Sequence, residues 1–189
     1  MDMMPIMNVF NEWHAANTSK KLRAVFESNA KSGKYKTNYP PYGYIKGTDK
    51  NCTPIVDPYS AEIIRRIYEM RASGMNVKKI AETLNNEKIL VPSDYYYKHQ
   101  GKPNPYFTEH LWSAGMVKRL LKNPVYLGHL IQLRTTTVSY KNHKVVKKDE
   151  SEWAVIENNH EPIISQELWD RVREIDNSVS NGKSTKNGV

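Results

Sequence analysis

The spacing of apolar residues along the chain predicts amphipathic helices separated by polar segments. In residues 3–30, apolar side chains recur at helical spacing on both sides of a polar join at residues 17–19. A helix of about 26 residues extends about 40 Å at about 1.5 Å per residue, which is longer than a small domain covers. Part of the apolar stripe therefore needs another surface, and self-association through this helix is one expectation.

Two further helices are predicted after a linker and a short hairpin. Residues 31–44 are small, basic and aromatic, which is typical of a linker, and residues 42–45 can pair with residues 53–56. Asp57-Pro58 is a helix start and Asn76 caps a second helix. The two helices resemble the first half of a helix-turn-helix unit.

Residues 90–112 form a long connection that contains three consecutive tyrosines, Tyr95, Tyr96 and Tyr97. A connection of this length is usually functional or partly mobile. The tyrosines could stack on bases or contact phosphates, but packing back against their own domain is the favoured interpretation.

The sequence predicts a short helix at residues 114–122, and the interpretation of the chain centres on it. Ser113 is placed as its N-cap, and Asn123-Pro124 ends it. One face is apolar and the opposite face carries Gly115 and basic residues. Such a helix can read a DNA groove, where Gly115 allows a phosphate or base edge to come close. The alternative is an ordinary amphipathic helix with a solvated basic face.

Short strands are predicted after this helix. A strand opens at residues 126–131, and residues 128–133, 143–148 and 153–157 are expected to form a small antiparallel sheet with a polar tip at 135–142. The hairpin would be a basic wing beside the short helix. A last helix follows, and residues 178–189 read as a flexible linker. The predicted fold class is α+β, with a long N-terminal helix and then a helix-turn-helix-like or winged helical domain with small antiparallel strands.

Charge is segregated along the 189 residues. The formal net charge is +8. Residues 118–148 carry eight basic and no acidic residues, residues 18–50 carry eight basic and two acidic residues, and residues 149–189 carry an acidic excess. This separation is the electrostatic pattern expected of a protein that binds a polyanion such as double-stranded DNA.

Several other classes of function find no support in the sequence. The apolar runs are too short to cross a bilayer, and the N-terminus does not resemble a signal peptide, so we expect a cytoplasmic protein without a membrane partner. The single cysteine, Cys52, excludes an internal disulfide, and the six histidines lack metal-ligand spacing. We therefore expect no cofactor, no metal and no catalytic set in this chain.

An ordered set of motifs across residues 8–177 resembles the large serine recombinases, the integrases and transposases of phages and mobile elements. The set comprises NEW at 11–13, TSKKLRAVF at 18–26, PYGY at 41–44, WS at 112–113, VKRLLKNPVYLG at 117–128 and HEPIIS at 160–165. The resemblance implies a site-specific recombinase that acts in DNA recombination and integration.

The resemblance also implies a division of the chain. Residues 1–31 would be the end of the long helix from a catalytic domain, 32–44 a basic arm, 45–177 the DNA-binding recombinase domain, and 178–189 a linker to a missing C-terminal domain. The segment with the serine nucleophile is expected to be missing, so Ser19, Ser28 and Ser32 are not assigned that role. The fragment itself is then not an enzyme, although its parent would be.

The candidate DNA-binding residues follow from the charge pattern and from the family resemblance. By resemblance, residues 31–39 would run along the minor groove and the helix at 114–122 would enter the major groove. The candidates are Lys20, Lys21, Arg23, Lys31, Lys34, Lys36, Tyr39, Ser113, Gly115, Lys118, Arg119, Lys122, Arg134, Lys141 and Lys144. A winged-helix transcriptional regulator that dimerises through the long helix is an alternative, and a protein–protein scaffold is a second one.

Overall fold

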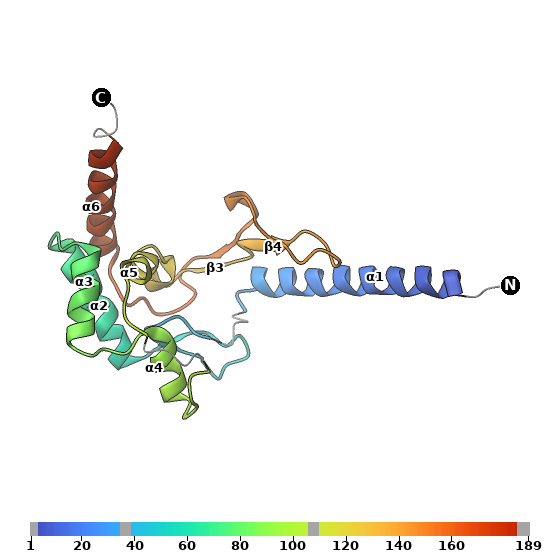
Figure 1. Ribbon diagram of the computed structural model, residues 1–189, viewed down its shortest axis with the longest axis horizontal. Helices are drawn as coiled ribbons and strands as arrows, with labels where there is room; N and C mark the ends of the chain where they lie inside the picture. The colour runs from blue at the N-terminus through green and yellow to red at the C-terminus, as the bar shows by residue number, and fades with distance from the viewer. Residues whose placement is uncertain (1–3, 35–38, 106–109, 185–189) are drawn as a thin grey trace.

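A computed structural model describes residues 4–34, 39–105 and 110–184. A helical domain holds the core, and two long helices project from it, α1 (Met4–Lys31) and α6 (Gln166–Ser184) (Figure 1). Two-stranded antiparallel pairs connect these parts. The expected combination of a long N-terminal helix with a helical domain and small antiparallel strands is confirmed.

Helix α1 is continuous across the polar join at residues 17–19, as predicted. It points away from the helical domain, with its C-terminal end nearest to it (Figure 1). Phe10 and Trp13 are each 60% exposed, and Leu22, Val25 and Phe26 are exposed as well. The apolar stripe of α1 is therefore solvent-facing, as the length of the helix led us to expect.

The helical domain is built on capped helices. Strands β1 (Tyr44–Ile45) and β2 (Ile55–Val56) pair antiparallel and lead into α2 (Pro58–Ala72), whose N-cap Asp57 accepts a hydrogen bond from the Ser60 backbone N–H. Helix α3 (Val77–Asn86) begins at the N-cap Asn76. Both starts match the sequence prediction, because an N-cap side chain satisfies an N–H that has no partner in the first turn.

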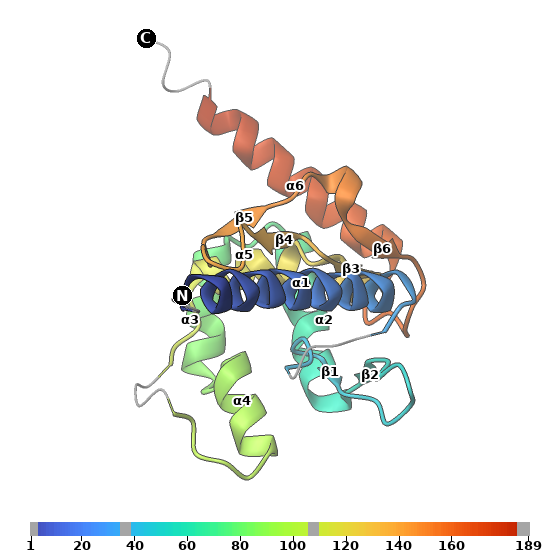
Figure 2. The ribbon, with the colours of Figure 1, turned by 90° about the vertical axis from the view of Figure 1, so that its right-hand side faces the viewer.

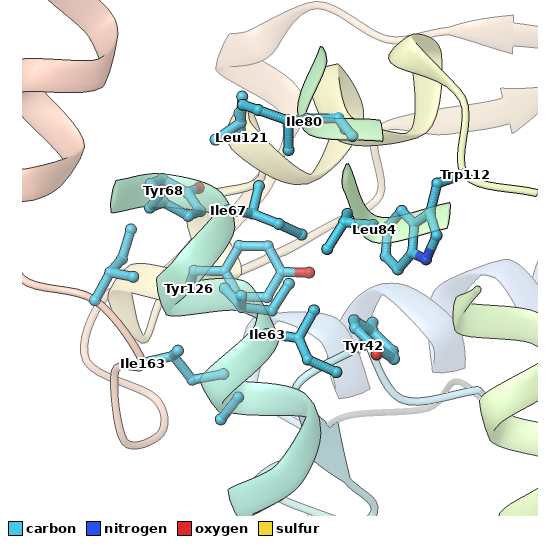
Figure 3. Close-up of a cluster of buried hydrophobic side chains, with 14 of the residues drawn as sticks. Tyr42, Ile63, Ile67, Tyr68, Ile80, Leu84, Trp112, Leu121, Tyr126 and Ile163 are labelled. Atoms are coloured by element: carbon cyan, nitrogen blue, oxygen red, sulfur yellow. The ribbon is translucent and has the colours of Figure 1, made fainter. Parts of the chain in front are cut away.

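The core lies where α2, α3, α5 (Ala114–Leu121) and α6 meet (Figure 3). Its fully buried side chains come from each of these helices and from the segment after α5. They include Ile64, Ile67, Tyr68, Ile80, Leu84, Val117, Leu121, Tyr126 and Val172. Tyr68 links α2 to two other helices. Its ring stacks on Trp169 of α6 at 6.2 Å, and its hydroxyl donates to the Leu120 carbonyl of α5.

The long connection at 90–112 contains a helix that the sequence did not predict, α4 (Pro92–His99). Its proline stands at the first helical turn, where the missing N–H costs nothing. Tyr95 packs against the core cluster, and its hydroxyl donates to Asp57 Oδ2 at 2.6 Å. This long-range bond links α4 to the start of α2, and it agrees with the interpretation that the tyrosines pack on their own domain.

The strands after α5 differ from the prediction. The segment predicted to open a strand at residue 126 begins instead with a 3-10 helix, η1 (Pro124–Leu127), which ends at Gly128 with φ +84°. A Cβ at position 128 would lie 2.5 Å from the His160 carbonyl oxygen, so only glycine fits there. The strand proper is β3 (Leu130–Gln132), and it pairs with β6 (Ala154–Ile156).

A single sheet does not form. Strand β4 (Thr135–Thr137) lies in the segment expected to be a polar tip, and it pairs with β5 (Val145–Lys147). Leu133, between β3 and β4, has φ +60°, which turns the chain and separates the two ladders. A second 3-10 helix, η2 (Glu150–Glu152), connects β5 to β6.

Helix α6 continues through Ser184, so residues 178–184 are helical rather than the flexible linker that we expected. Ser165 starts the helix by accepting from the Leu168 N–H, and Val172 is fully buried against the core. Once tertiary packing has nucleated a helix, each added residue gains a hydrogen bond, so the helix extends beyond its packed part. Residues 185–189 lie outside the described residues.

Candidate nucleic-acid interface

The outer face of α5 presents five candidate residues together. Val117 and Leu121 are buried on the inner face. Exposed on the outer side are Ser113, Gly115, Lys118, Arg119 and Lys122. The orientation predicted from the apolar spacing is therefore correct, and these five residues are called the α5 face below.

The start of α5 is fixed by a side chain of α3. Asn85 Oδ1 accepts from the Trp112 N–H at 2.8 Å, and Asn85 Nδ2 donates to the Trp112 carbonyl at 3.0 Å. The Trp112 indole N–H donates to the Ile89 carbonyl at 2.8 Å. Ser113 Oγ then accepts from the Met116 N–H at 3.3 Å as the N-cap. These bonds set the position of the α5 face relative to the core.

Gly115 leaves an open patch in the middle of this face. A Cβ built at this position would have Ser113 Oγ, at 3.8 Å, as its nearest neighbour. Packing against the described residues therefore does not require glycine at this position. The space allows a phosphate or a base edge to approach the helix backbone, which is the use that the sequence suggested.

A second group of candidates lies between α1 and the β4–β5 hairpin. Arg23 Nη2 donates to Thr137 Oγ1 at 3.1 Å, and Lys141 Nζ lies 2.7 Å from Glu12 Oε1. Lys20 and Lys21 are exposed on α1, and Lys144 is exposed on the hairpin. An open hollow of about 760 Å³ separates the two elements and is lined by residues of both.

The basic hairpin is not a wing beside α5. In Figure 1 it lies along α1, and β3 separates it from α5. Figure 2 shows the β4–β5 pair directly above α1. The arrangement that we expected is wrong because Arg23 and Glu12 bind hairpin side chains, a contact between distant segments that hydrophobic spacing does not report. Arg134, at the hairpin's base, lies over the Trp153 ring at 4.9 Å.

The predicted arm is attached at both of its described ends. At its start, the Lys34 carbonyl accepts from Gln132 Nε2 at 3.0 Å, and Lys31 forms an ion pair with Glu27 at 2.9 Å. At its end, the Tyr39 hydroxyl lies 3.2 Å from that of Tyr97 on α4. Lys36 lies outside the described residues. The described residues on either side of positions 35–38 therefore lie beside the β3–β6 pair and beside α4.

The candidates that the structure describes thus fall on three surfaces: the α5 face, the α1–hairpin group and the arm. The first was predictable, because helical spacing alone orients a helix. The contacts that organise the other two involve Glu12 and Thr137, which the sequence reasoning did not select. Asn85, which holds α5, was also missed, and a lone asparagine inside a helix gives no signal of such a role.

Cationic and hydroxyl groups dominate these surfaces, and such groups can contact phosphates. In the part of the chain that the structure describes, no group of three or more histidine, cysteine, aspartate or glutamate side chains is placed to hold a metal ion. None of the described helices is both long enough and apolar enough to span a membrane. The hydrogen bond to Glu12 raises the pKa of Lys141 above its usual value.

Comparison with known proteins gives matches in family and fold. Residues 58–177 match the family model described as Recombinase. The fold is similar to that in a crystal structure of an LSR–DNA complex, with 18% sequence identity and a TM-score of 0.50. It is similar to the same degree to a structure from work on the sequence requirements of the Listeria innocua prophage attP site, again with 18% identity and a TM-score of 0.50.

These matches cover most of this chain but only part of the solved ones. Each spans 83% of this chain, and they cover 39% and 51% of the two solved chains, respectively. No curated protein matches the sequence.

Proposed function

We propose, since this chain belongs to the Recombinase family, that it binds double-stranded DNA at the attachment sites of a site-specific large serine recombinase. The family membership confirms the resemblance drawn from the sequence. The observation that carries the proposal is the α5 face, where Lys118, Arg119 and Lys122 project from a helix whose opposite side is buried in the core.

The proposed mechanism divides the work between two kinds of contact. Lysine and arginine side chains of the arm, α1 and the hairpin neutralise phosphates and fix the register of the domain on the duplex. Side chains of the α5 face enter the major groove and read base edges, where arginine and lysine pair with guanine acceptors. The arm from Lys31 to Tyr39 follows the adjacent minor groove. Recognition, not strand cleavage, is then the role of this chain.

A binding experiment tests the proposal. The target is first selected from random duplexes at fixed salt, and affinities for that target are then measured by gel shift. Arg119→Ala and Lys122→Ala should weaken specific binding much more than Lys147→Ala, a matched loss of charge on the exposed strand β5. Equal losses of affinity for the three variants would show that α5 does not read the base sequence.

Salt dependence supplies a second measurement. If six to eight phosphates are engaged, the logarithm of the association constant should fall with the logarithm of salt concentration with a slope of about −5 to −7. A flat salt response together with no gel shift would favour the protein–protein scaffold. A covalent protein–DNA adduct formed by this chain would contradict a purely binding role.

A deletion separates the recombinase from the winged-helix regulator. Removal of residues 1–38 should reduce minor-groove affinity if the arm follows DNA. In a regulator that dimerises through the long helix, the same deletion should abolish dimers first.

A further inference from the structure

Aromatic rings gather beside α4, and none of them belongs to the α5 face. The Tyr59 and Tyr95 rings are stacked with centroids 5.5 Å apart and an interplanar angle of 18°. The Tyr95 ring is also stacked with His99, at 5.9 Å and 27°. Tyr59, Tyr95 and His99 thus form a continuous stack of three rings, called the aromatic column below.

The middle ring of the column is anchored by a buried carboxylate. The Tyr95 hydroxyl donates to Asp57 Oδ2 at 2.6 Å, and the Ser60 hydroxyl donates to the same oxygen. Burial raises the pKa of Asp57, but the hydrogen bonds from Ser60 and Tyr95 outweigh it and hold the pKa below its usual value. The carboxylate therefore stays ionised and keeps the Tyr95 ring in a fixed orientation.

The outer rings of the column remain open to solvent. Tyr59 is 58% exposed, and His99 is also exposed. One hollow of about 360 Å³ lies between α4 and residues 40–46, and another of about 580 Å³ is lined by Tyr59, Leu90, Tyr95, Lys98 and His99. Exposed aromatic faces beside hollows of this size can accept further flat rings.

The charged groups around the column include carboxylates that are engaged within the protein and lysines that are exposed. Asp57 accepts hydrogen bonds from Ser60 and Tyr95. Residues 88–105 contain three lysines and one acid, Asp94. Asp94 is already engaged, with His110 Nδ1 at 2.9 Å from its carboxylate and Asn104 donating to it. Lys98 and Lys102 are exposed. A ligand with flat rings and a negatively charged backbone matches both properties of this surface.

We propose that the aromatic column, with Lys98 beside it, is a binding site for the unpaired bases of single-stranded DNA. Base–aromatic stacking tolerates any sequence because every base has a flat face, and lysines beside the stack follow the phosphates. A duplex does not fit this use, since its base faces are covered by their neighbours in the stack. The site is separate from the α5 face, so it does not depend on the proposed duplex binding.

The test measures binding of a fluorescein-labelled oligothymidylate to the whole chain by anisotropy. Tyr59→Leu keeps an apolar side chain but removes the ring, and it should weaken binding about 5- to 100-fold. Tyr59→Phe keeps the ring and should retain the affinity of the parent chain within about twofold. Tyr140→Leu, a tyrosine loss on the hairpin away from the column, is the matched control and should leave binding unchanged.

The lysines give an independent readout. Lys98→Ala should make the salt dependence of single-strand binding shallower by about 0.7 in slope, the value for one phosphate contact on a single strand. Tyr59→Leu should leave binding to the selected duplex unchanged, whereas Arg119→Ala should weaken duplex binding and spare the oligothymidylate. The two proposals can therefore fail separately.

Three results would overturn the single-strand site. The first is the absence of saturable oligothymidylate binding, and the second is an equal effect of Tyr59→Leu and Tyr140→Leu. The third is binding of a proline-rich peptide at the column, if Tyr59→Leu weakens that binding and the oligonucleotide does not displace the peptide. Thermal unfolding of each variant is measured to confirm that the substitution, including the one at exposed position 59, leaves the chain folded.

Discussion

The side-chain ammonium of Lys141 lies 2.7 Å from Glu12 Oε1 and joins the tip of the β4–β5 hairpin to the middle of α1. The two residues are 129 positions apart in the sequence. Arg23, further along α1, contacts Thr137 on the same hairpin. Two side chains proposed to contact DNA are therefore engaged within the protein.

Glu12→Gln is expected to raise the affinity for duplex DNA. Both members of the Glu12–Lys141 pair are exposed, so solvent screens their attraction and a DNA phosphate can compete with the carboxylate. The amide releases Lys141 and removes one negative charge from the side that is proposed to face DNA. We expect an affinity about two- to tenfold higher at low salt, with a salt slope steeper by about 0.9. A gel-shift series over several salt concentrations measures both quantities.

Glu174→Gln is the control for this prediction, because it removes an exposed acid from α6 without touching the hairpin. It should change affinity much less than Glu12→Gln does. Unchanged or weaker duplex binding by the Glu12 variant would show that Lys141 does not contact DNA.

Asn85→Ala is expected to destabilise the domain through α5. The variant removes both hydrogen bonds between the Asn85 amide and the backbone of Trp112. At about 1 kcal/mol for each bond, the free energy of unfolding should fall by about 2 kcal/mol. Urea denaturation measures this loss.

Asn86→Ala supplies the comparison at the next position of the same helix, where the side chain is exposed. Its effect should stay within about 0.5 kcal/mol, as is usual for surface positions. Alanine has a higher helix propensity than asparagine, so propensity alone would stabilise both variants. Similar losses for the two variants would mean that the hydrogen bonds to Trp112 do not explain the result.

Asp176→Ala is expected to be more damaging, because it leaves a buried guanidinium without its counter-ion. Arg71 is 5% exposed and approaches Asp176 Oδ1 with Nε at 2.8 Å and Nη2 at 2.7 Å. Loss of one partner from a buried pair costs about 3 to 5 kcal/mol, and the partial exposure of Asp176 favours the lower value. Urea denaturation measures the loss, which also reports how firmly α6 is held to α2.

The double variant Arg71→Met with Asp176→Leu separates charge from packing. Replacement of a buried ion pair by apolar side chains of similar size is often neutral. The double variant should therefore be more stable than Asp176→Ala. If it is less stable, packing by the Arg71 and Asp176 side chains, rather than the unpaired charge, dominates.

The helices were predictable because their signals are local. Asp57, Asn76 and Ser113 each accept a hydrogen bond from the first turn of the helix that they precede, as the sequence indicated. Apolar spacing correctly placed Val117 and Leu121 inside, and this also placed the basic side of α5 outside. The spacing of apolar residues along a helix indicates which of its faces is buried. The part of the candidate site on α5 could therefore be predicted from the sequence.

The missed elements depend on distant partners. Helix α4 has eight residues, fewer than an isolated helix needs, and the bond from Tyr95 to Asp57 contributes to holding it in place. Strand β4 consists of three threonines that read as a polar loop until β5 pairs with them. The contact between the hairpin and α1 likewise involves Lys141 and Glu12, which are far apart in the sequence, so the apolar spacing of either segment does not report it.

Acidification is expected to destabilise the fold through His160. This residue is 8% exposed, and its Nε2–H donates to the Val125 carbonyl at 2.8 Å, while Nδ1 is buried and has no hydrogen-bond partner in the described part of the chain. Burial lowers the pKa of His160, the bond to Val125 opposes this, and nearby His129 lowers the pKa further. The net direction is downward, so the folded state favours the neutral ring.

The sign of the pH effect follows from this direction. In the unfolded chain the ring titrates near its ordinary pKa of about 6.5, and below that pH the unfolded state binds a proton that the folded state resists. The stabilisation by neutral His160 is therefore complete above about pH 6.5 and is lost as the pH falls through the lower pKa of the folded state. The free energy of unfolding, measured by urea between pH 7.5 and 5, should decrease with acidification.

His160→Gln should flatten this dependence, whereas His143→Gln, at an exposed position, should keep it. Parallel pH profiles for the parent chain and the His160 variant would assign the acid sensitivity to other groups.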